Sequence, residues 1–205
     1  RKIIKILMKF PYRKADKIVA ICKELSQDLS NHVKKSVITI YSPSIDKEII
    51  KLQNSKINYK FFKNKTYIIN VSRFSEYKGQ MDILRATKPI LKYRNNIRLI
   101  LIGYGEYKKE LLKFININKI KSKVKIIDNC YNPYPYIKKS NLFVFSSNYE
   151  GFPNVINEAL MLNTPVISSN CKSGPKEMLL NGKGGDFYPK KDYIRLRKLI
   201  ENYLK

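Results

Sequence analysis

Two glutamates bracket the start of one predicted helix, in a chain that has only 16 acidic residues. Glu150 and Glu158 are separated by the stretch Gly-Phe-Pro-Asn-Val-Ile-Asn. Glu158 would lie one helical turn beyond Asn154, with its side chain leaning back toward the helix N-terminus. A carboxylate there could bind vicinal hydroxyls, as on a ribose, and Glu150 could hold a second polyol group. The alternative is that either acid is a solvated charge or a partner of the helix dipole.

The start of this helix could itself bind an anion. Pro153 suits the first helical position, because the N–H that proline lacks has no partner within the helix there. Phe152 is then the N-cap, and its side chain cannot accept hydrogen bonds from the first amides as Ser or Asp would. The amides of Asn154 and Val155 are therefore predicted to be free for an anion. The alternatives are that water satisfies them, or that the proline stands one position away from the one assumed.

Two cations and two glycine-containing turns follow other predicted strands. Arg73 and Lys78 lie in "VSRFSEYKGQ", where Gly79 permits a tight turn before the next helix. Two cations in one crevice could clamp a diphosphate and stabilise it as a leaving group. The segment "GYGE", which begins at Gly103, matches only part of a glycine-rich phosphate loop, and a tight turn is the alternative. The segment "SGPKE" over 173–177 could line the same crevice or cap its own helix.

The elements that would position these residues alternate regularly from residue 66 onward. Strands are predicted over 66–72, 97–103, 123–127, 141–147 and 164–169, and helices over 79–93, 106–118, 132–140, 153–162, 174–180 and 193–204. The strands are nearly continuous apolar runs, which is typical of a parallel sheet covered on both faces. The fold class is therefore α/β, a Rossmann-like doubly wound parallel sheet.

Ligands of such sheets bind beyond the carboxyl ends of the strands. The loops after Val71, Ile102, Ile127, Ser146 and Ser168 are therefore expected to carry the chemistry. Asn163 stands where the helix over 153–162 must stop, and asparagine is the second choice after glycine for a left-handed C-terminal residue.

The chain before residue 66 is organised differently. It predicts a strand over 17–22, a helix over 23–33, a strand over 36–41 and a turn over 42–46. Residues 51–65 are polar and rich in Lys and Asn, which predicts a linker or an edge segment.

The charge of the chain is strongly positive, with 41 Lys and Arg against 16 Asp and Glu and a net charge of +25. The cations are nearly all lysines spread along the whole chain, whereas arginine is the better residue for base and phosphate recognition. A specific nucleic-acid function is therefore not expected. Peripheral contact with an anionic membrane surface remains open.

Three cysteines, Cys22, Cys130 and Cys171, lie far apart in the sequence, and no Cys/His spacing of metal ligands is present. Neither a metal site nor a disulfide framework is expected, and a reducing cytoplasm fits. No apolar run is long enough to cross a membrane, and the first ten residues contain no signal-peptide core. The expected location is cytoplasmic. Whether the protein also contacts the inner face of the membrane peripherally is left open.

Together these loops resemble the donor-binding half of a retaining glycosyltransferase of family 4, the glycosyltransferase group 1 with the GT-B fold. The resemblance rests on "VSRFSEYKGQ", "LIGYGEYKKEL", "NPYPYIKKSNLFVFSSNYEGFPNVINEAL" and "TPVISSNCKSGPKEML", and it covers about residues 15 to 190. Its most specific part is the pair of glutamates with seven residues between them, which include Gly-Phe-Pro-Asn.

The resemblance implies a role for each candidate residue. Arg73 and Lys78 would hold the diphosphate of a sugar nucleotide, most simply a UDP-sugar, and Glu150 would contact the transferred sugar. Glu158 would bind the ribose hydroxyls. Other binding residues would be Gly103, Ile127, Asp128, Gly151, Phe152, Asn154 and Val155, with the loop after Ile127 near the base. No metal or other cofactor would be needed, because the cations and the helix terminus stabilise the leaving diphosphate.

The sequence departs from the family pattern in two ways. Asp128 stands where the family usually has glycine, which places an acid near the base or phosphate pocket. Residues 1–50 resemble only the end of an N-terminal acceptor domain and the passage from it, 51–65 a linker or edge, and 66–205 the nucleotide-sugar-binding domain. The expected reaction is transfer of a hexose or N-acetylhexosamine to a glycan or lipid-linked acceptor, with the acceptor domain separately encoded or lost. The alternative is a non-catalytic remnant that binds a sugar nucleotide or a partner, and the isolated chain is expected to be inactive if it needs an acceptor domain.

Overall fold

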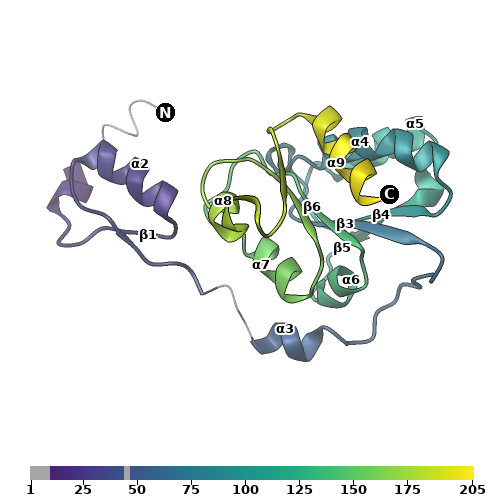
Figure 1. Ribbon diagram of the computed structural model, residues 1–205, viewed down its shortest axis with the longest axis horizontal. Helices are drawn as coiled ribbons and strands as arrows, with labels where there is room; N and C mark the ends of the chain where they lie inside the picture. Colours follow the sequence, from purple (N-terminus) through teal and green to yellow (C-terminus); the bar gives the residue numbers. More distant parts are fainter. Residues whose placement is uncertain (1–9, 44–46) are drawn as a thin grey trace.

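A computed structural model describes residues 10–43 and 47–205 of the chain (Figure 1). Its centre is a six-stranded sheet in which every pair of neighbouring strands is parallel, in the order β5-β4-β3-β6-β7-β8. The strands are β3 (Thr66–Val71), β4 (Ile97–Gly103), β5 (Val124–Asp128), β6 (Leu142–Phe145), β7 (Val166–Ser169) and β8 (Asp186–Tyr188). The prediction of an α/β fold with a doubly wound parallel sheet is confirmed.

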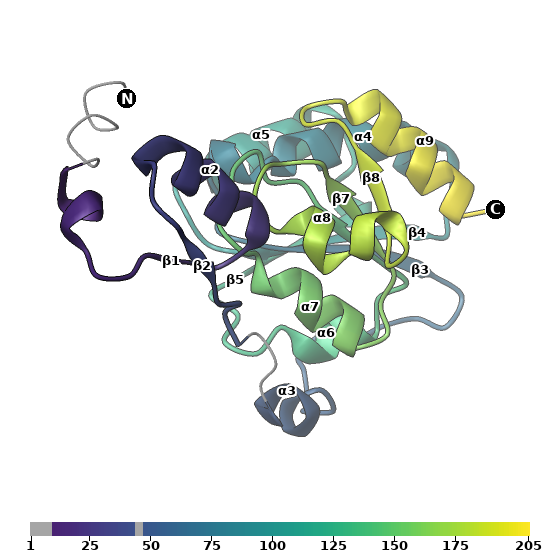
Figure 2. The ribbon, with the colours of Figure 1, turned by 60° about the vertical axis from the view of Figure 1, so that its left-hand side comes forward.

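Helices join these strands and cover both faces of the sheet. They are α4 (Gln80–Tyr93), α5 (Lys108–Ile117), α6 (Tyr134–Lys138), α7 (Asn154–Met161), α8 (Pro175–Met178) and α9 (Tyr193–Tyr203), with short 3-10 turns η1 (Glu76–Lys78), η2 (Lys121–Lys123) and η3 (Leu180–Gly182). Figures 1 and 2 show α4, α5 and α9 on one face and α6 and α7 on the other. Each of these six helices overlaps a helix predicted from the sequence, with ends that differ by a few residues.

The core consists of two layers of apolar side chains, one on each face of the sheet. Neighbouring residues of β3 point to opposite faces of the sheet. Ile68 therefore joins the layer between the sheet and α4, α5 and α9, and Ile69 joins the layer between the sheet and α6 and α7. Both side chains are fully buried. This double burial explains why the strands appear in the sequence as unbroken apolar runs.

The order of the strands creates a topological switch point at one place in the sheet. The chain runs outward from β3 through β4 to β5, then returns to the other side of β3 and continues outward through β6, β7 and β8. The loops after β3 and β6 therefore diverge in opposite directions from neighbouring strands. In open α/β sheets, ligands bind beyond the carboxyl ends of strands at such a switch point.

Residues before the main sheet form a smaller unit. β1 (Val19–Ala20) and β2 (Ile38–Thr39) pair in parallel and flank α2 (Lys23–Val33), which matches the predicted helix. The predicted strands over 17–22 and 36–41 are shortened to two residues each. Each has a single partner strand, and Val19 and Ile38 are about half exposed, so little pairing or burial extends the strands further. The turn predicted over 42–46 falls largely on 44–46, outside the described residues.

The segment expected to be a linker or an edge, 51–65, contains the end of α3 (Lys47–Leu52) and then irregular structure. Two of its aromatic residues, Tyr59 and Phe61, pack on the main domain. The ring centroids of Tyr59 and Phe61 are 5.0 Å apart, and those of Phe61 and Tyr67 are 4.5 Å apart. The segment is therefore attached to the sheet by ring contacts.

Candidate functional site

The loops after β3 and β6 are joined at the switch point. Gly79 has a φ of +68°, and a Cβ at this position would lie 2.2 Å from the carbonyl oxygen of Ser146. The hydroxyl of Ser146 donates to the carbonyl of Lys78 at 2.6 Å, and the amide of Asn148 donates to the carbonyl of Tyr77 at 2.8 Å. Only glycine allows this approach, and the hydrogen bonds then fix the two loops against each other.

The two loops bring together two of the predicted site residues. Nζ of Lys78 lies 2.5 Å from Oε1 of Glu150, and the side chains are only 29% and 12% exposed. Water screens such a pair poorly, so the carboxylate and the ammonium hold each other in place. An anion that bound beside Lys78 would compete with Glu150 for the ammonium.

Arg73 does not join this pair. Its guanidinium lies 3.5 Å from the carboxylate of Glu106, and both side chains are mostly exposed. The backbone of Arg73 is nevertheless fixed, because the buried amide of Gln80 donates at 2.7 Å to both the Arg73 carbonyl and the Ser72 hydroxyl. Arg73 is thus an exposed cation on an anchored loop.

The glycine turn after β4 packs directly on this loop. A Cβ on Gly103 would lie 2.0 Å from the carbonyl oxygen of Ser72, and one on Gly105 would lie 2.2 Å from that of Phe74. The "GYGE" turn therefore supports the β3 loop, which fits the structural alternative for this motif. It also holds Glu106 next to Arg73.

The N-cap of α7 differs from the prediction by one residue. Pro153 is the N-cap, with φ of −76° and ψ of 90°, and the helix begins at Asn154. The prediction of Phe152 as N-cap was wrong, because the φ of proline also suits a cap and ψ at Pro153 is extended. The consequence for the amides is unchanged, since neither residue offers a side-chain acceptor. The amides of Asn154 and Val155 have no acceptor in the part of the chain that the structure describes, whereas Ile156 donates to Pro153 at 3.0 Å.

Glu158 follows one turn later on α7. Ile156 and Ala159 are buried, while Val155 and Leu160 are only half-buried. Glu158 is itself half-buried, and burial raises the pKa of its carboxyl group. Among the described residues no hydrogen bond or ion pair involves this carboxylate. It is thus a partly desolvated carboxylate that still reaches the surface and can accept hydrogen bonds from a ligand.

The negative charge of Asp128 is compensated by a lysine. It is the last residue of β5, pairs in register with Gly103, and its carboxylate lies 2.5 Å from Nζ of Lys108. The ion pair lowers the repulsion that an unpaired acid would exert on an anion nearby. Ile127 packs against the core layer between the sheet and α6 and α7.

The N-terminal unit reaches the backbone of the candidate site, which the sequence did not indicate. Sγ of Cys22 is 3.9 Å from the carbonyl oxygen of Gly151, and a Cβ on Gly151 would lie 3.2 Å from Cδ1 of Ile21. The rings of Tyr41 and Phe152 are 5.8 Å apart. Residues from two parts of the chain thus enclose the turn between Glu150 and α7.

Glu177, in the "SGPKE" segment, caps a helix of this N-terminal unit. Its carboxylate accepts from the amides of Lys23 and Glu24 at 3.1 and 2.9 Å and from the Tyr41 hydroxyl at 2.8 Å. In return, the carboxylate of Glu24 accepts from the Ser173 amide at 2.7 Å. The N-terminus of α2 is therefore occupied by a protein carboxylate, unlike that of α7.

Among the described residues, no group of three or more His, Cys, Asp and Glu side chains is placed to hold a metal ion. In the same ranges, no helix combines the length and the apolar character needed to cross a membrane.

A family model described as "Glycosyl transferases group 1" matches residues 53–205, which is more than half of the chain. An uncharacterized glycosyltransferase of Methanocaldococcus jannaschii is 37% identical over 187 residues, 87% of this chain and 45% of that protein. A protein of Campylobacter jejuni is 32% identical over 181 residues, 85% of this chain and 47% of its own length. Its name is N-acetylgalactosamine-N,N'-diacetylbacillosaminyl-diphospho-undecaprenol 4-alpha-N-acetylgalactosaminyltransferase. The chain thus spans about half the length of these curated relatives.

Solved structures of glycosyltransferases share the fold. A glycosyltransferase of Rickettsia africae matches with a TM-score of 0.85 and 19% identity over 100% of this chain and 57% of that one. HepE of Anabaena, solved in complex with UDP-glucose, matches with a TM-score of 0.75 and 20% identity over 98% of this chain and 57% of that one. The six-stranded parallel sheet is therefore of the kind found in GT-B glycosyltransferases.

Proposed function

The chain belongs to the group 1 glycosyl transferases, and from this we propose that it forms the nucleotide-sugar-binding half of such an enzyme. The observation that carries the proposal is the set of groups at the switch point. Lys78 offers a cation, the start of α7 offers two unbonded amides, and Glu158 offers a carboxylate without a partner among the described residues. These are the groups that a diphosphate joined to a ribose requires.

We place the diphosphate between Lys78 and the N-terminus of α7. The amides of Asn154 and Val155 and the helix dipole favour negative charge there. Lys78 would leave Glu150 to contact the phosphate, and Arg73 would turn from its exposed partner to do the same. Both cations would then stabilise the charge that develops on the leaving diphosphate, which gives them their catalytic role without a metal.

The two glutamates would hold hydroxyl groups on either side of that anion. Glu150, once released from Lys78, accepts hydrogen bonds from the transferred sugar, near the backbone of Gly151 and Phe152. Glu158 accepts from the vicinal hydroxyls of the ribose, which are well-matched donors for a partly buried carboxylate. The base would lie beside Ile127 and Asp128, on the far side of Gly103. The structure of HepE with UDP-glucose supports uridine as the base.

The reaction we propose is transfer of a hexose or N-acetylhexosamine from a UDP-sugar to a glycan or lipid-linked acceptor, with retention of configuration at the anomeric carbon. The name of the Campylobacter relative includes a diphospho-undecaprenol acceptor, which supports a lipid-linked acceptor here. We place the acceptor site in a second domain, whether on the same polypeptide or separately encoded. The net charge of +25 supports contact with an anionic membrane that would carry such an acceptor.

Isothermal titration calorimetry of the chain with UDP, UDP-glucose and UDP-N-acetylglucosamine tests the proposal. We expect saturable binding with a Kd below about 1 mM and weaker binding of ADP and GDP. If none of these nucleotides binds at millimolar concentration to the folded protein, the proposal is wrong. No observation favours the alternative, a non-catalytic remnant. Such a remnant would also bind the UDP-sugar, so calorimetry alone does not separate the two hypotheses. Slow hydrolysis of the UDP-sugar by this chain would contradict the remnant hypothesis.

A further inference from the structure

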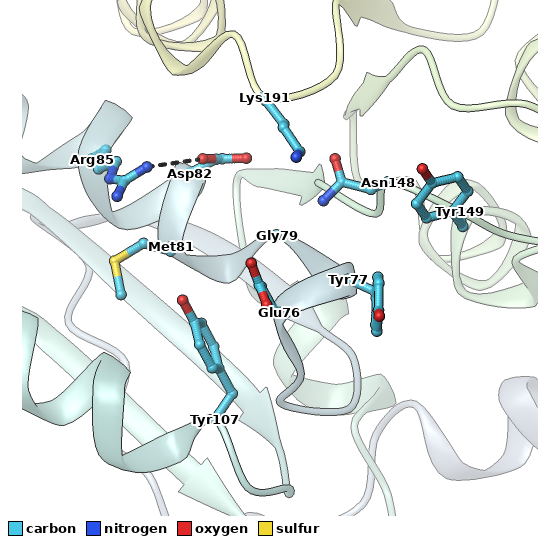
Figure 3. A pocket seen from close by; sticks show the side chains of 10 residues that line it. All are labelled: Glu76, Tyr77, Gly79, Met81, Asp82, Arg85, Tyr107, Asn148, Tyr149 and Lys191. Carbon is cyan, nitrogen blue, oxygen red and sulfur yellow. Dashed lines mark ion pairs between the residues drawn. The ribbon is translucent and has the colours of Figure 1, made fainter.

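A cavity of about 410 Å³ opens beside the candidate donor site (Figure 3). It is lined by η1, the first turns of α4, the residue before α5, the two residues that precede Glu150, and Lys191 before α9. Neither Lys78 nor Glu150 lines it, and its volume lies within the range of ligand pockets, about 300–1,000 Å³. The groups assigned to the donor leave this cavity unused.

One buried polar atom in the wall lacks a partner. Asn148 is 7% exposed, and its Oδ1 has no hydrogen bond among the described residues. Figure 3 shows its amide directed into the cavity, toward Asp82 and Lys191. Leaving such an acceptor unsatisfied is unfavourable, so the site favours a ligand that donates a hydrogen bond.

The charges around the cavity balance. Asp82 is 8% exposed and lies 3.7 Å from Arg85, while Glu76 and Lys191 add one charge of each sign. A phosphate would meet two carboxylates and a cation would meet two basic groups. A neutral ligand with several hydroxyls meets neither repulsion, and it can both donate to and accept from these side chains.

Aromatic rings supply the remaining wall. Tyr107 is half-buried, and its hydroxyl end points toward the cavity in Figure 3. Tyr77 and Tyr149 stand at the rim with their ring centroids 6.3 Å apart, and they are 62% and 57% exposed. Rings that combine an apolar face with a polar end suit a sugar, which presents C–H groups on one face and hydroxyls at its edge.

We propose that this cavity is a second carbohydrate site, which takes one or two neutral hexose units of a glycan. Because Tyr77 and Tyr149 immediately precede Lys78 and Glu150, a glycan held here would contact both loops of the donor site. The inference does not depend on the proposed donor chemistry.

The test is a titration of the ¹⁵N-labelled chain, followed by amide chemical shifts, with methyl α-glucoside, the methyl α-glycoside of N-acetylglucosamine, maltotriose and, separately, inorganic phosphate. We expect saturable shifts at Asp82, Tyr107 and Lys191 for at least one sugar, with a Kd on the order of 1–10 mM. Asn148→Leu should weaken this binding about tenfold or more. Tyr77→Ala, at an exposed position, should also weaken it and serves if Asn148→Leu does not fold.

Lys78→Met is the matched control. It should leave sugar binding at the cavity unchanged while it weakens the binding of UDP, which separates this inference from the proposed function. The inference is overturned if no sugar gives saturable shifts, if sugars shift only residues around Lys78 and Glu158, or if both cavity variants bind sugar as the wild type does. Shifts at the cavity with phosphate but not with sugar would overturn it as well.

Discussion

Glu158 shows what folding has done to a single residue of the candidate site. Its carboxyl group is half-buried beside the core of α7, its pKa is raised by burial, and no described residue bonds to it. A raised pKa means that the folded state holds the proton more tightly than the unfolded state does. The contribution of this group to stability is therefore complete below the ordinary pKa of glutamate, about 4.3, and is lost as pH rises through the folded value.

Glu158→Gln should remove this pH dependence. We expect the free energy of unfolding of the variant to fall less than that of the wild type as pH rises from about 4 toward neutrality. Each unit of pKa shift corresponds to about 1.4 kcal/mol. Urea denaturation across this pH range measures the effect, and Glu110→Gln on the exposed face of α5 is the control for loss of one carboxylate. Parallel curves for Glu158→Gln and wild type would refute the account.

Lys78→Met should weaken UDP binding by about 10- to 100-fold, because a charged hydrogen bond to phosphate is worth about 1.5–3 kcal/mol. Calorimetry measures the loss. Lys109→Met, an exposed lysine of α5, should bind UDP as the wild type does. Lys78→Met leaves the carboxylate of Glu150 without its cation. The double variant Lys78→Met/Glu150→Gln should therefore recover stability but not affinity for UDP. Equal affinity in all four proteins would exclude Lys78 from the site.

At the scale of single residues, the sequence predicted where the candidate site residues lie better than which residues they interact with. The amides at the start of α7 and the positions of Glu150 and Glu158 followed from local pattern. The partners of Arg73, Asp128 and Glu177 did not, because Glu106, Lys108 and the N-terminus of α2 come near them only through the tertiary fold. Gln80 and Asn148 carried no signal either, since nothing local shows that a polar side chain will be buried.

At the scale of elements, the site depends on how closely two loops approach. The loop after β3 ends in η1 and Gly79, and the loop after β6 crosses it at Ser146. Both follow strands that are neighbours in the sheet but lie far apart in the sequence. The position of Lys78 relative to Glu150 is therefore set by this crossing.

Gly79→Ala should destabilise the protein by about 2–4 kcal/mol, the sum of a left-handed conformation and a clash at 2.2 Å with Ser146. Chemical denaturation gives the value. Gly182→Ala is the matched control, because its φ is +104° but nothing lies within 4 Å of the added carbon, so we expect only the conformational cost of about 1–2 kcal/mol. Equal losses in the two variants would mean that the loops can separate freely.

The long strands were predictable from their nearly continuous apolar runs, and the helices from the amphipathic segments between them. The left-handed Asn163, which has φ of 55°, followed from the preference of asparagine for the C-terminal end of a helix. β8 was missed because its three residues follow two glycines and form no apolar run. Likewise, α3 lies in a stretch without clear periodicity. Its burial is limited to Ile49, which tertiary packing rather than sequence pattern selects.

At the scale of the whole molecule, a carboxylate joins the N-terminal unit to the main domain. Burial of Glu177 raises its pKa, but hydrogen bonds from Glu24, Lys23 and Tyr41 outweigh burial, so the pKa lies below its ordinary value. A depressed pKa contributes stability that is present above the unfolded value and lost as pH falls through the folded value. The attachment should therefore weaken in acid.

Glu177→Ala should release α2, because two amides at its N-terminus lose their acceptor. We expect faster hydrogen exchange throughout Lys23–Val33, equivalent to about 1–3 kcal/mol, with little change in β3 and β4. Asp28→Asn is the control at the same interface, since Asp28 and Lys172 form an exposed pair at 3.8 Å that is worth about 1 kcal/mol or less. Unchanged exchange in α2 would show that other contacts hold the N-terminal unit.

Chemical-shift mapping of UDP on the ¹⁵N-labelled chain tests the central claim most directly, because it reports both binding and place. The account predicts saturable shifts at the amides of Arg73, Lys78, Asn154, Val155 and Glu158, on the two loops that meet at the switch point. It would be contradicted if the folded chain gave no saturable shift at about 5 mM UDP, or if the shifts lay only on elements away from these loops.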